Sequence, residues 1–189
     1  ENDRDRSDVI GCALRILPHL CVRISDMLDM EWSAINFKKA EWNFVVGKTK
    51  ERGVGEFTCH LSEQVLAILT ELKSFKMKGS DKVFVSLESK LGRIRNESMM
   101  GRIRKRLGFT NDDTTIHGFR ATARTLGAEE LGFDSVVIER AIQHMTKESL
   151  GVSYDRTQYI KQRKEFMQSW SDFLTQVRKE HQKTLIKLA

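Results

Sequence analysis

The chain has 189 residues, 40% of them hydrophobic and 31% charged, which is typical of one soluble globular domain that folds without disulfides or a structural metal. No apolar run approaches the roughly 20 residues of a membrane span, and the charged start, Glu1 to Arg6, is unlike a secretory signal. The net charge of +6 favours a polyanionic partner, although charge alone does not separate nucleic acid from an anionic membrane or from mere solubility.

The cysteine and proline content indicates a cytoplasmic protein with a single domain. Cys12, Cys21 and Cys59 are an odd set without the short spacing of a metal site, so we expect reduced thiols that pack in the core. The chain contains one proline and no low-complexity stretch, so residues 1–189 are expected to fold as one unit. Its first residue is not Met, so we expect a fragment of a longer protein.

Two helices are predicted at the start of the chain. The first covers residues 7 to about 17 and is expected to end near Pro18, because proline interrupts helical hydrogen bonding. The second begins at about residue 24. Its apolar side chains recur at helical spacing, and they are Ile24, Met27, Leu28 and Trp32.

A change of period then predicts a β-hairpin. Residues 41–46 and 56–61 are short runs rich in aromatic and β-branched side chains, and the basic segment between them, residues 48–55, contains two glycines. Ser62 is suited to cap the helix that follows. One apolar stripe of that helix is predicted to face the core, and it consists of Val65, Ile68, Leu69, Leu72 and Phe75.

The remaining elements are predicted to be helices. Asn96 can cap a helix that has a basic face and ends before Gly108, and its apolar residues are Met100, Ile103 and Leu107. Further helices are expected over residues 117–131, 135–143, around Tyr154, and from about residue 160 onward. The last carries an apolar stripe, most simply core packing, formed by Phe166, Trp170, Phe173 and Val177. The predicted fold class is therefore mainly α, with a small antiparallel β-sheet.

Three segments of the sequence resemble the boxes of one enzyme family, in that family's order. Residues 20–37 read LCVRISDMLDMEWSAINF, residues 115–124 read TIHGFRATAR, and residues 137–154 read VIERAIQHMTKESLGVSY. These segments resemble the catalytic domain of tyrosine recombinases of the phage integrase family, and residues 156–174 resemble the tails of prophage and genomic-island integrases. The resemblance extends from about residue 14 to 174, which is nearly the whole chain.

The resemblance implies a role for each matching residue. It identifies Arg23 and Arg120 as phosphate-clamping arginines, and Asp26 as a supporting carboxylate that orients Arg23 where the family more often has Glu. The hairpin lysine of the family corresponds to Lys48, with Lys50 as the alternative. The remaining implied catalytic residues are His117, His144 and the nucleophile Tyr154. The other tyrosine, Tyr159, lies too far beyond His144 for the family's spacing, and His19, His60 and His181 are interpreted as structural.

These residue types suit attack on a DNA phosphodiester. Its transition state spreads negative charge over the nonbridging oxygens, and two arginines present planar forks of donors to that charge, which lysine cannot reproduce. A tyrosine attacking phosphorus would leave a 3′-phosphotyrosyl bond and a free 5′-hydroxyl, so bond energy is kept for rejoining. No cofactor or metal is expected. The sequence shows neither a carboxylate cluster nor a His/Cys cluster with ligand spacing.

The partner implied by the resemblance is double-stranded DNA. Phosphate contacts are expected from a basic run, normally just a solvated helix face, that contains Arg93, Arg95, Arg102, Arg104, Lys105 and Arg106. The resemblance implies two N-terminal DNA-binding modules absent from this chain, a monomer in solution, and a tetramer on DNA in a bacterial nucleoid. It also implies a protomer contact through residues of about 160–189. Two alternatives stay open: a type IB topoisomerase, and a non-catalytic DNA-binding regulatory protein.

Overall fold

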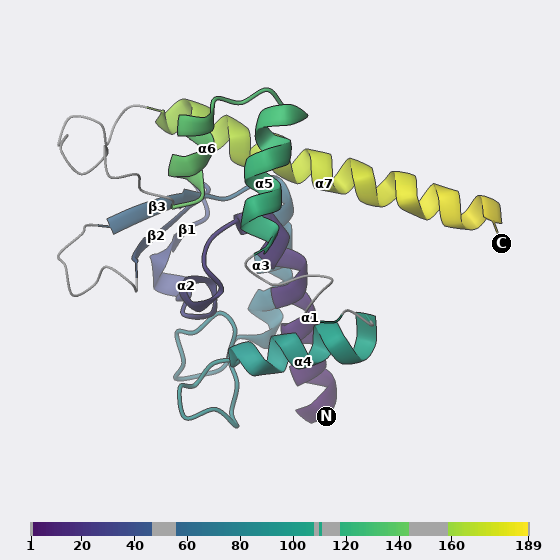
Figure 1. Ribbon diagram of the computed structural model, residues 1–189. Coiled ribbons are helices and arrows are strands. Elements are labelled where there is room, and N and C mark those ends of the chain that lie inside the picture. The colour runs from purple at the N-terminus through teal and green to yellow at the C-terminus, as the bar shows by residue number, and fades with distance from the viewer. Residues whose placement is uncertain (1, 47–55, 108–109, 111–117, 144–158, 189) are drawn as a thin grey trace.

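The computed structural model describes residues 2–46, 56–107, 110, 118–143 and 159–188, with side chains described for 9–46, 56–103, 110, 118–143 and 159–184. Helices dominate this part of the chain, and one small antiparallel sheet lies at one side of them (Figure 1). The predicted fold class is therefore confirmed. Among the described residues, no helix is both long and apolar enough to cross a membrane.

The first helix, α1 (Asn2–Leu20), is longer than predicted and contains Pro18. It ends two residues after Pro18, so the prediction that it ends near this proline is confirmed, although the proline itself does not interrupt it. The proline lies in the last turn, where the carbonyls are free to bind partners outside the helix, and its own carbonyl accepts a 2.8 Å hydrogen bond from Nε1 of Trp170. The chain turns only at Cys21, which has a left-handed φ of 53°.

The second helix, α2 (Ile24–Leu28), is shorter than predicted because the chain turns away to pair with a distant loop. Trp32 lies in a separate 3-10 turn, η1 (Trp32–Ala34), and not on the predicted helix. Its backbone N–H donates to the carbonyl of Asp81 at 2.9 Å, and Val83 donates to the carbonyl of Met30 at 3.0 Å. These non-local backbone bonds replace the helical ones.

The predicted hairpin is confirmed and has one additional strand. Strands β1 (Ile35–Asn36), β2 (Glu41–Val45) and β3 (Glu56–His60) form an antiparallel sheet in that order. Trp42 on β2 is opposite Ile35 on one side and Cys59 on the other, and its side chain is buried. The predicted tip, residues 48–55, lies outside the described residues.

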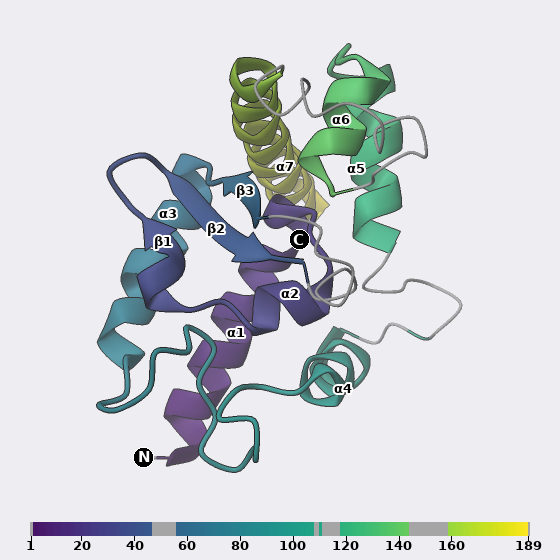
Figure 2. The ribbon, with the colours of Figure 1, turned by 90° about the vertical axis from the view of Figure 1, so that its left-hand side faces the viewer.

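Helix α3 (Glu63–Leu72) packs against α1, on the opposite side of the sheet from the viewer in Figure 2. Ser62 caps its N-terminus as predicted, accepting a 3.4 Å hydrogen bond from the backbone N–H of Val65. Phe75 lies in the 3-10 turn η3 (Lys73–Phe75) and is half-buried. The rest of the predicted stripe is buried: Val65, Ile68, Leu69 and Leu72.

The later helices are α4 (Asn96–Leu107), α5 (Gly118–Glu129), α6 (Ser135–Ala141) and α7 (Ile160–Leu188). They confirm the predicted helices, although α5 and α6 end two residues earlier than predicted. On α4, Ile103 is buried as predicted, but Met99 is buried more deeply than Met100. The predicted helix around Tyr154 and the predicted C-cap Gly108 lie outside the described residues.

Helix α7 belongs to the core at its start and leaves the body of the protein toward the C-terminus (Figure 1). Phe166 and Trp170 are buried, Phe173 is half-buried, and Val177 is 46% exposed. The predicted apolar stripe is therefore core packing only over its first half. The same core contains all three cysteines as free, buried thiols, as predicted.

Candidate active site

Arg23 lies where the chain enters α2. The left-handed turn at Cys21 ends α1, and Arg23 then occupies the N-cap position of α2 with an extended backbone. Asp26 follows one turn later, as expected from sequence, and its carboxylate is 3.9 Å from Nη1 of Arg23. Asp26 is only 6% exposed, so this ion pair forms at the protein's interior.

Arg120 reaches the same region from α5. Its side chain is buried, and its Nη2 donates a hydrogen bond to the carbonyl of Ile142, the residue that follows α6. Arginine is rarely buried unless its charge is paired. Helices α5 and α6 therefore hold the guanidinium from one side, and its Nη1 has no acceptor among the described residues.

The structure brings Arg23 and Arg120 together. Burial lowers the pKa of Arg120, and repulsion from the neighbouring Arg23 lowers it further, whereas Cys21, Asp26 and Glu139 act in the opposite direction. Nη1 of each arginine is buried and has no hydrogen-bond acceptor within the described part of the chain. The 3.9 Å separation from Asp26 is too long for a hydrogen bond. Two cations close enough to repel each other, each with an Nη1 that no described residue binds, form a site that suits an anion such as phosphate.

Sequence reasoning missed a second buried carboxylate near this pair, Glu139 on α6. Its side chain forms an ion pair with Nε of Arg124, which lies one helical turn after Arg120 on α5. Arg120 and Arg124 have the i, i+4 spacing that places two side chains on one helix face. That spacing was visible in the sequence, but the pairing of this face with Glu139 depends on how α5 and α6 pack.

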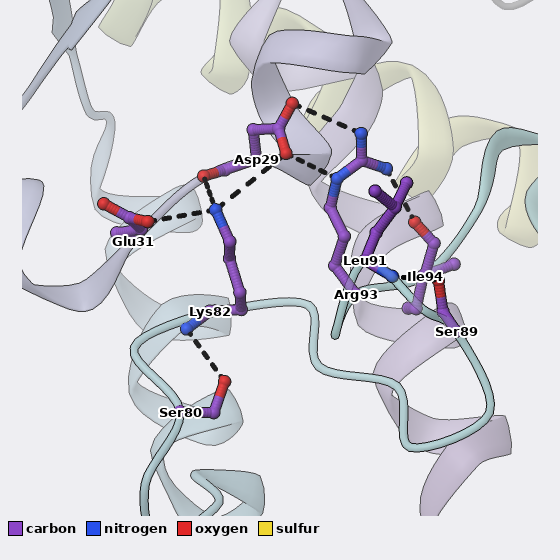
Figure 3. Close-up of polar contacts among 8 residues, drawn as sticks. All are labelled: Asp29, Glu31, Ser80, Lys82, Ser89, Leu91, Arg93 and Ile94. Carbon is purple, nitrogen blue, oxygen red and sulfur yellow. Dashed lines mark hydrogen bonds and ion pairs between the residues drawn. The ribbon is translucent and has the colours of Figure 1, made fainter.

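Arg93, the first residue of the basic run, forms an ion pair with a carboxylate of the same chain. In Figure 3, Arg93 presents its fork to the carboxylate of Asp29, at 2.5 Å from Nε to Oδ1 and 3.2 Å from Nη2 to Oδ2. Its Nη1 also donates to the carbonyl of Ile94 at 3.0 Å. Lys82 joins the same group, with Nζ 3.0 Å from Oε1 of Glu31. This geometry favours a structural role for Arg93, which ties the loop before α4 to the end of α2.

The other predicted DNA-binding residues differ in exposure. Arg95 is exposed, and Arg102 is half-buried. The side chains of Arg104, Lys105 and Arg106 lie outside those that the structure describes, although their backbone continues α4.

Four predicted catalytic residues, Lys48, His117, His144 and Tyr154, lie outside the described residues, as does the alternative Lys50. The residues that border them are described. Gln143, directly before His144, is buried with a left-handed φ of 61°, and Tyr159 has a φ of 72°. Nothing within the described ranges groups three or more His, Cys, Asp or Glu side chains as a metal site would require.

Comparison with known proteins agrees with this geometry. Residues 6–160 match the phage integrase family, and the chain belongs to that family, whose members are tyrosine recombinases. Prophage integrase IntA of Escherichia coli is 31% identical over 152 residues, which are 80% of this chain and 35% of that relative. The chain thus spans about a third of the length of this relative.

Two solved structures share the fold. An integrase from mycobacterium phage Brujita aligns with a TM-score of 0.57 and 18% identity, covering 85% of this chain and 50% of that one. The XerA recombinase aligns with a TM-score of 0.54 and 16% identity, covering 86% and 62%. At these identities the likeness establishes the arrangement of helices and strands, and not the chemistry.

Proposed function

We propose that this chain is the catalytic part of an integrase that recombines DNA at specific sites, as in integration and excision of a prophage or genomic island. The observation that carries the proposal is the pair Arg23 and Arg120, close enough to repel each other and with buried Nη1 groups that lack acceptors among the described residues. Membership of the phage integrase family supports the same reaction. The bacterial prophage relative favours a bacterial cytoplasm as the place of action.

The two arginines would clamp the phosphate that is cut. Each guanidinium stays ionised and offers parallel N–H donors to the nonbridging oxygens, which gain charge as the pentacoordinate transition state forms. Because burial fixes Arg120, its donors need little reorganisation during the reaction. Loss of one such donor typically costs about 3 kcal/mol of transition-state stabilisation.

The remaining steps assign one role to each of the other catalytic residues. The oxygen of Tyr154 attacks phosphorus and forms the 3′-phosphotyrosyl bond, while the bond to the 5′-oxygen breaks. Tyrosine has an ordinary pKa of about 10, so neutral His117 accepts its proton. Lys48 donates a proton to the departing 5′-oxygen, and His144 donates a hydrogen bond to the phosphate. The charge that a metal would provide elsewhere comes here from guanidinium groups, so the scheme requires no metal.

The proposed partner is double-stranded DNA bound by a tetramer that exchanges strands in two rounds. Arg95, directly before α4, and four residues on that helix would contact backbone phosphates and make binding sensitive to salt. The four are Arg102, Arg104, Lys105 and Arg106. Arg93 would contribute mainly by holding the loop before α4, because its fork binds Asp29.

A nicked DNA substrate tests this proposal. The probe is a pool of duplexes with randomised sequence around a nick, placed so that the short strand released by cleavage diffuses away. We expect a fraction of the pool to become joined to the protein in a detergent-resistant adduct, and its sequence to reveal the preferred site. A chain that binds the pool without forming any adduct would be a passive DNA-binding protein, and the proposal would fail.

A further inference from the structure

Glu139 is an acidic side chain in the interior of a basic protein. It lies on α6 and is only 6% exposed, whereas its ion-pair partner Arg124 has a side chain that is 61% exposed. Burying a carboxylate is costly unless a nearby positive charge stabilises it. An exposed, solvated arginine is a weak source of that stabilisation.

A second positive charge lies close to Glu139. Arg120 and Arg124 occupy one face of α5, and this face packs against α6. Ile142, three residues after Glu139, accepts the hydrogen bond from Nη2 of Arg120, so α6 meets Arg120 near Glu139. Glu139 is also among the groups that raise the pKa of Arg120 against burial and against Arg23. Glu139 therefore faces two arginines, one solvated and one buried.

The negative charge of Glu139 offsets part of the repulsion between Arg120 and Arg23. Two guanidinium groups held side by side in a poorly solvated place repel each other and favour turning apart. Asp26 compensates on the α2 side, next to Arg23, and Glu139 compensates on the α6 side, behind Arg120. Arg124 neutralises part of the charge of Glu139, which limits repulsion of a bound phosphate.

We propose that Glu139 is a positioning residue for Arg120: its carboxylate keeps the buried guanidinium oriented toward the phosphate that is cut. This inference rests on the proposed function, because the phosphate is the DNA phosphate of that reaction.

Two matched substitutions separate this role from an ordinary helix-to-helix ion pair. Glu139→Gln removes the charge behind Arg120, whereas Arg124→Gln removes the same ion pair but leaves that charge. With the nicked duplex pool at saturating concentration, we expect Glu139→Gln to slow adduct formation at least about 10-fold, and Arg124→Gln by less than about 3-fold. Both variants should bind the duplex pool within about 3-fold of the unchanged chain. Equal loss in both, or no loss in Glu139→Gln, would overturn the proposal.

A spectroscopic measurement tests the same contact without DNA. The Nε–H resonance of Arg120 in ¹⁵N NMR spectra should move in Glu139→Gln and much less in Arg124→Gln, and an unmoved resonance in both would contradict the proposal. If Glu139→Gln does not fold, Glu139→Asp replaces it, because withdrawing the carboxylate by one methylene should give a smaller loss of the same kind. Absence of any adduct from the unchanged chain would instead reject the proposed function, even where the resonance moves.

Discussion

Arg23 at the start of α2 and Arg120 on α5 lie close enough for their repulsion to lower the pKa of Arg120, although about half of the chain separates them in sequence. Such an arrangement costs stability in the absence of an anion. The neighbouring carboxylate of Asp26 offsets only part of the cost. A pair of cations kept in this position is most simply explained by a phosphate that binds to both.

Arg120→Lys should slow adduct formation by about 100-fold or more, because a point charge cannot replace the two-donor fork. Binding to the duplex pool should change little, since many other phosphate contacts remain. Single-turnover cleavage of nicked DNA measures the rate, and Arg124→Lys, on the same helix and exposed, is the matched control. A near-normal rate for Arg120→Lys would count against the clamp.

Tyr154→Phe should abolish the covalent adduct and leave DNA affinity within about 2-fold, because it removes only the attacking oxygen. Denaturing gels of the nicked-substrate reaction detect the adduct. Tyr159→Phe is the control, and it should still form the adduct. An adduct that persists in Tyr154→Phe but is absent from Tyr159→Phe would transfer the nucleophile's role to Tyr159.

Asp29→Asn should lower the free energy of unfolding by about 1 kcal/mol, because it weakens the charge-assisted bonds from Arg93 shown in Figure 3. Urea unfolding measures the change. Arg93→Gln should cost a similar amount, and the double variant should show that the two effects are coupled. Arg95→Gln, at an exposed position two residues further, should change stability by less than about 0.5 kcal/mol. Additive effects of Asp29→Asn and Arg93→Gln would contradict the pairing.

Gly127→Ala should destabilise the protein by about 1–3 kcal/mol, because the new Cβ would lie 2.7 Å from Cε2 of Phe166 and 3.2 Å from Cδ1 of Ile138. The ring of Phe166 is buried and has little room to move. Gly101→Ala on α4 is the control: nothing lies within 4 Å of its Cβ, and alanine favours the helix by up to about 1 kcal/mol. Thermal unfolding of both variants checks the opposite signs, and a stabilised Gly127→Ala would contradict the close packing of α5 on α7.

His60 should make stability depend on pH. Burial, followed by repulsion from Arg163, lowers its pKa from 6.5 to about 4, so the unfolded chain binds a proton that the folded protein does not. The free energy of unfolding should therefore fall as the pH drops from about 6.5 to about 4, with His60 contributing about 2 kcal/mol. His19, with a pKa also lowered to about 4, adds an effect of the same sign. His60→Gln should make the free energy of unfolding, measured with urea, depend less on pH. His181→Gln, at an exposed position, is the control and should leave the pH dependence unchanged. An unchanged pH dependence in His60→Gln would contradict the role of His60.

Elements that depend on local chemistry were predictable from the sequence. The Ser62 cap, the hairpin strands and the stripe of α3 follow from turn residues and from hydrophobic period. The exact end of α1, two residues beyond Pro18, was not predictable, because the carbonyl of Pro18 is satisfied by Trp170, far along the chain. The end of α2 likewise depends on backbone bonds to Asp81 and Val83.

The candidate site shows the same division. The box around Arg23 and the one around Arg120 are visible as sequence patterns, and the folded chain brings these two arginines together. The partner of Arg93 and the burial of Glu139 follow from tertiary packing, which a basic run or a helical period does not encode. The sequence therefore could not show which charged side chains, far apart along the chain, form ion pairs with each other.

A crystal structure of the Tyr154→Phe chain on the duplex selected by the adduct assay tests the central claim most directly. We predict that the guanidinium groups of Arg23 and Arg120 both donate to nonbridging oxygens of the same phosphate, next to residue 154. Arginines bound to different phosphates, or to no phosphate, would contradict the account.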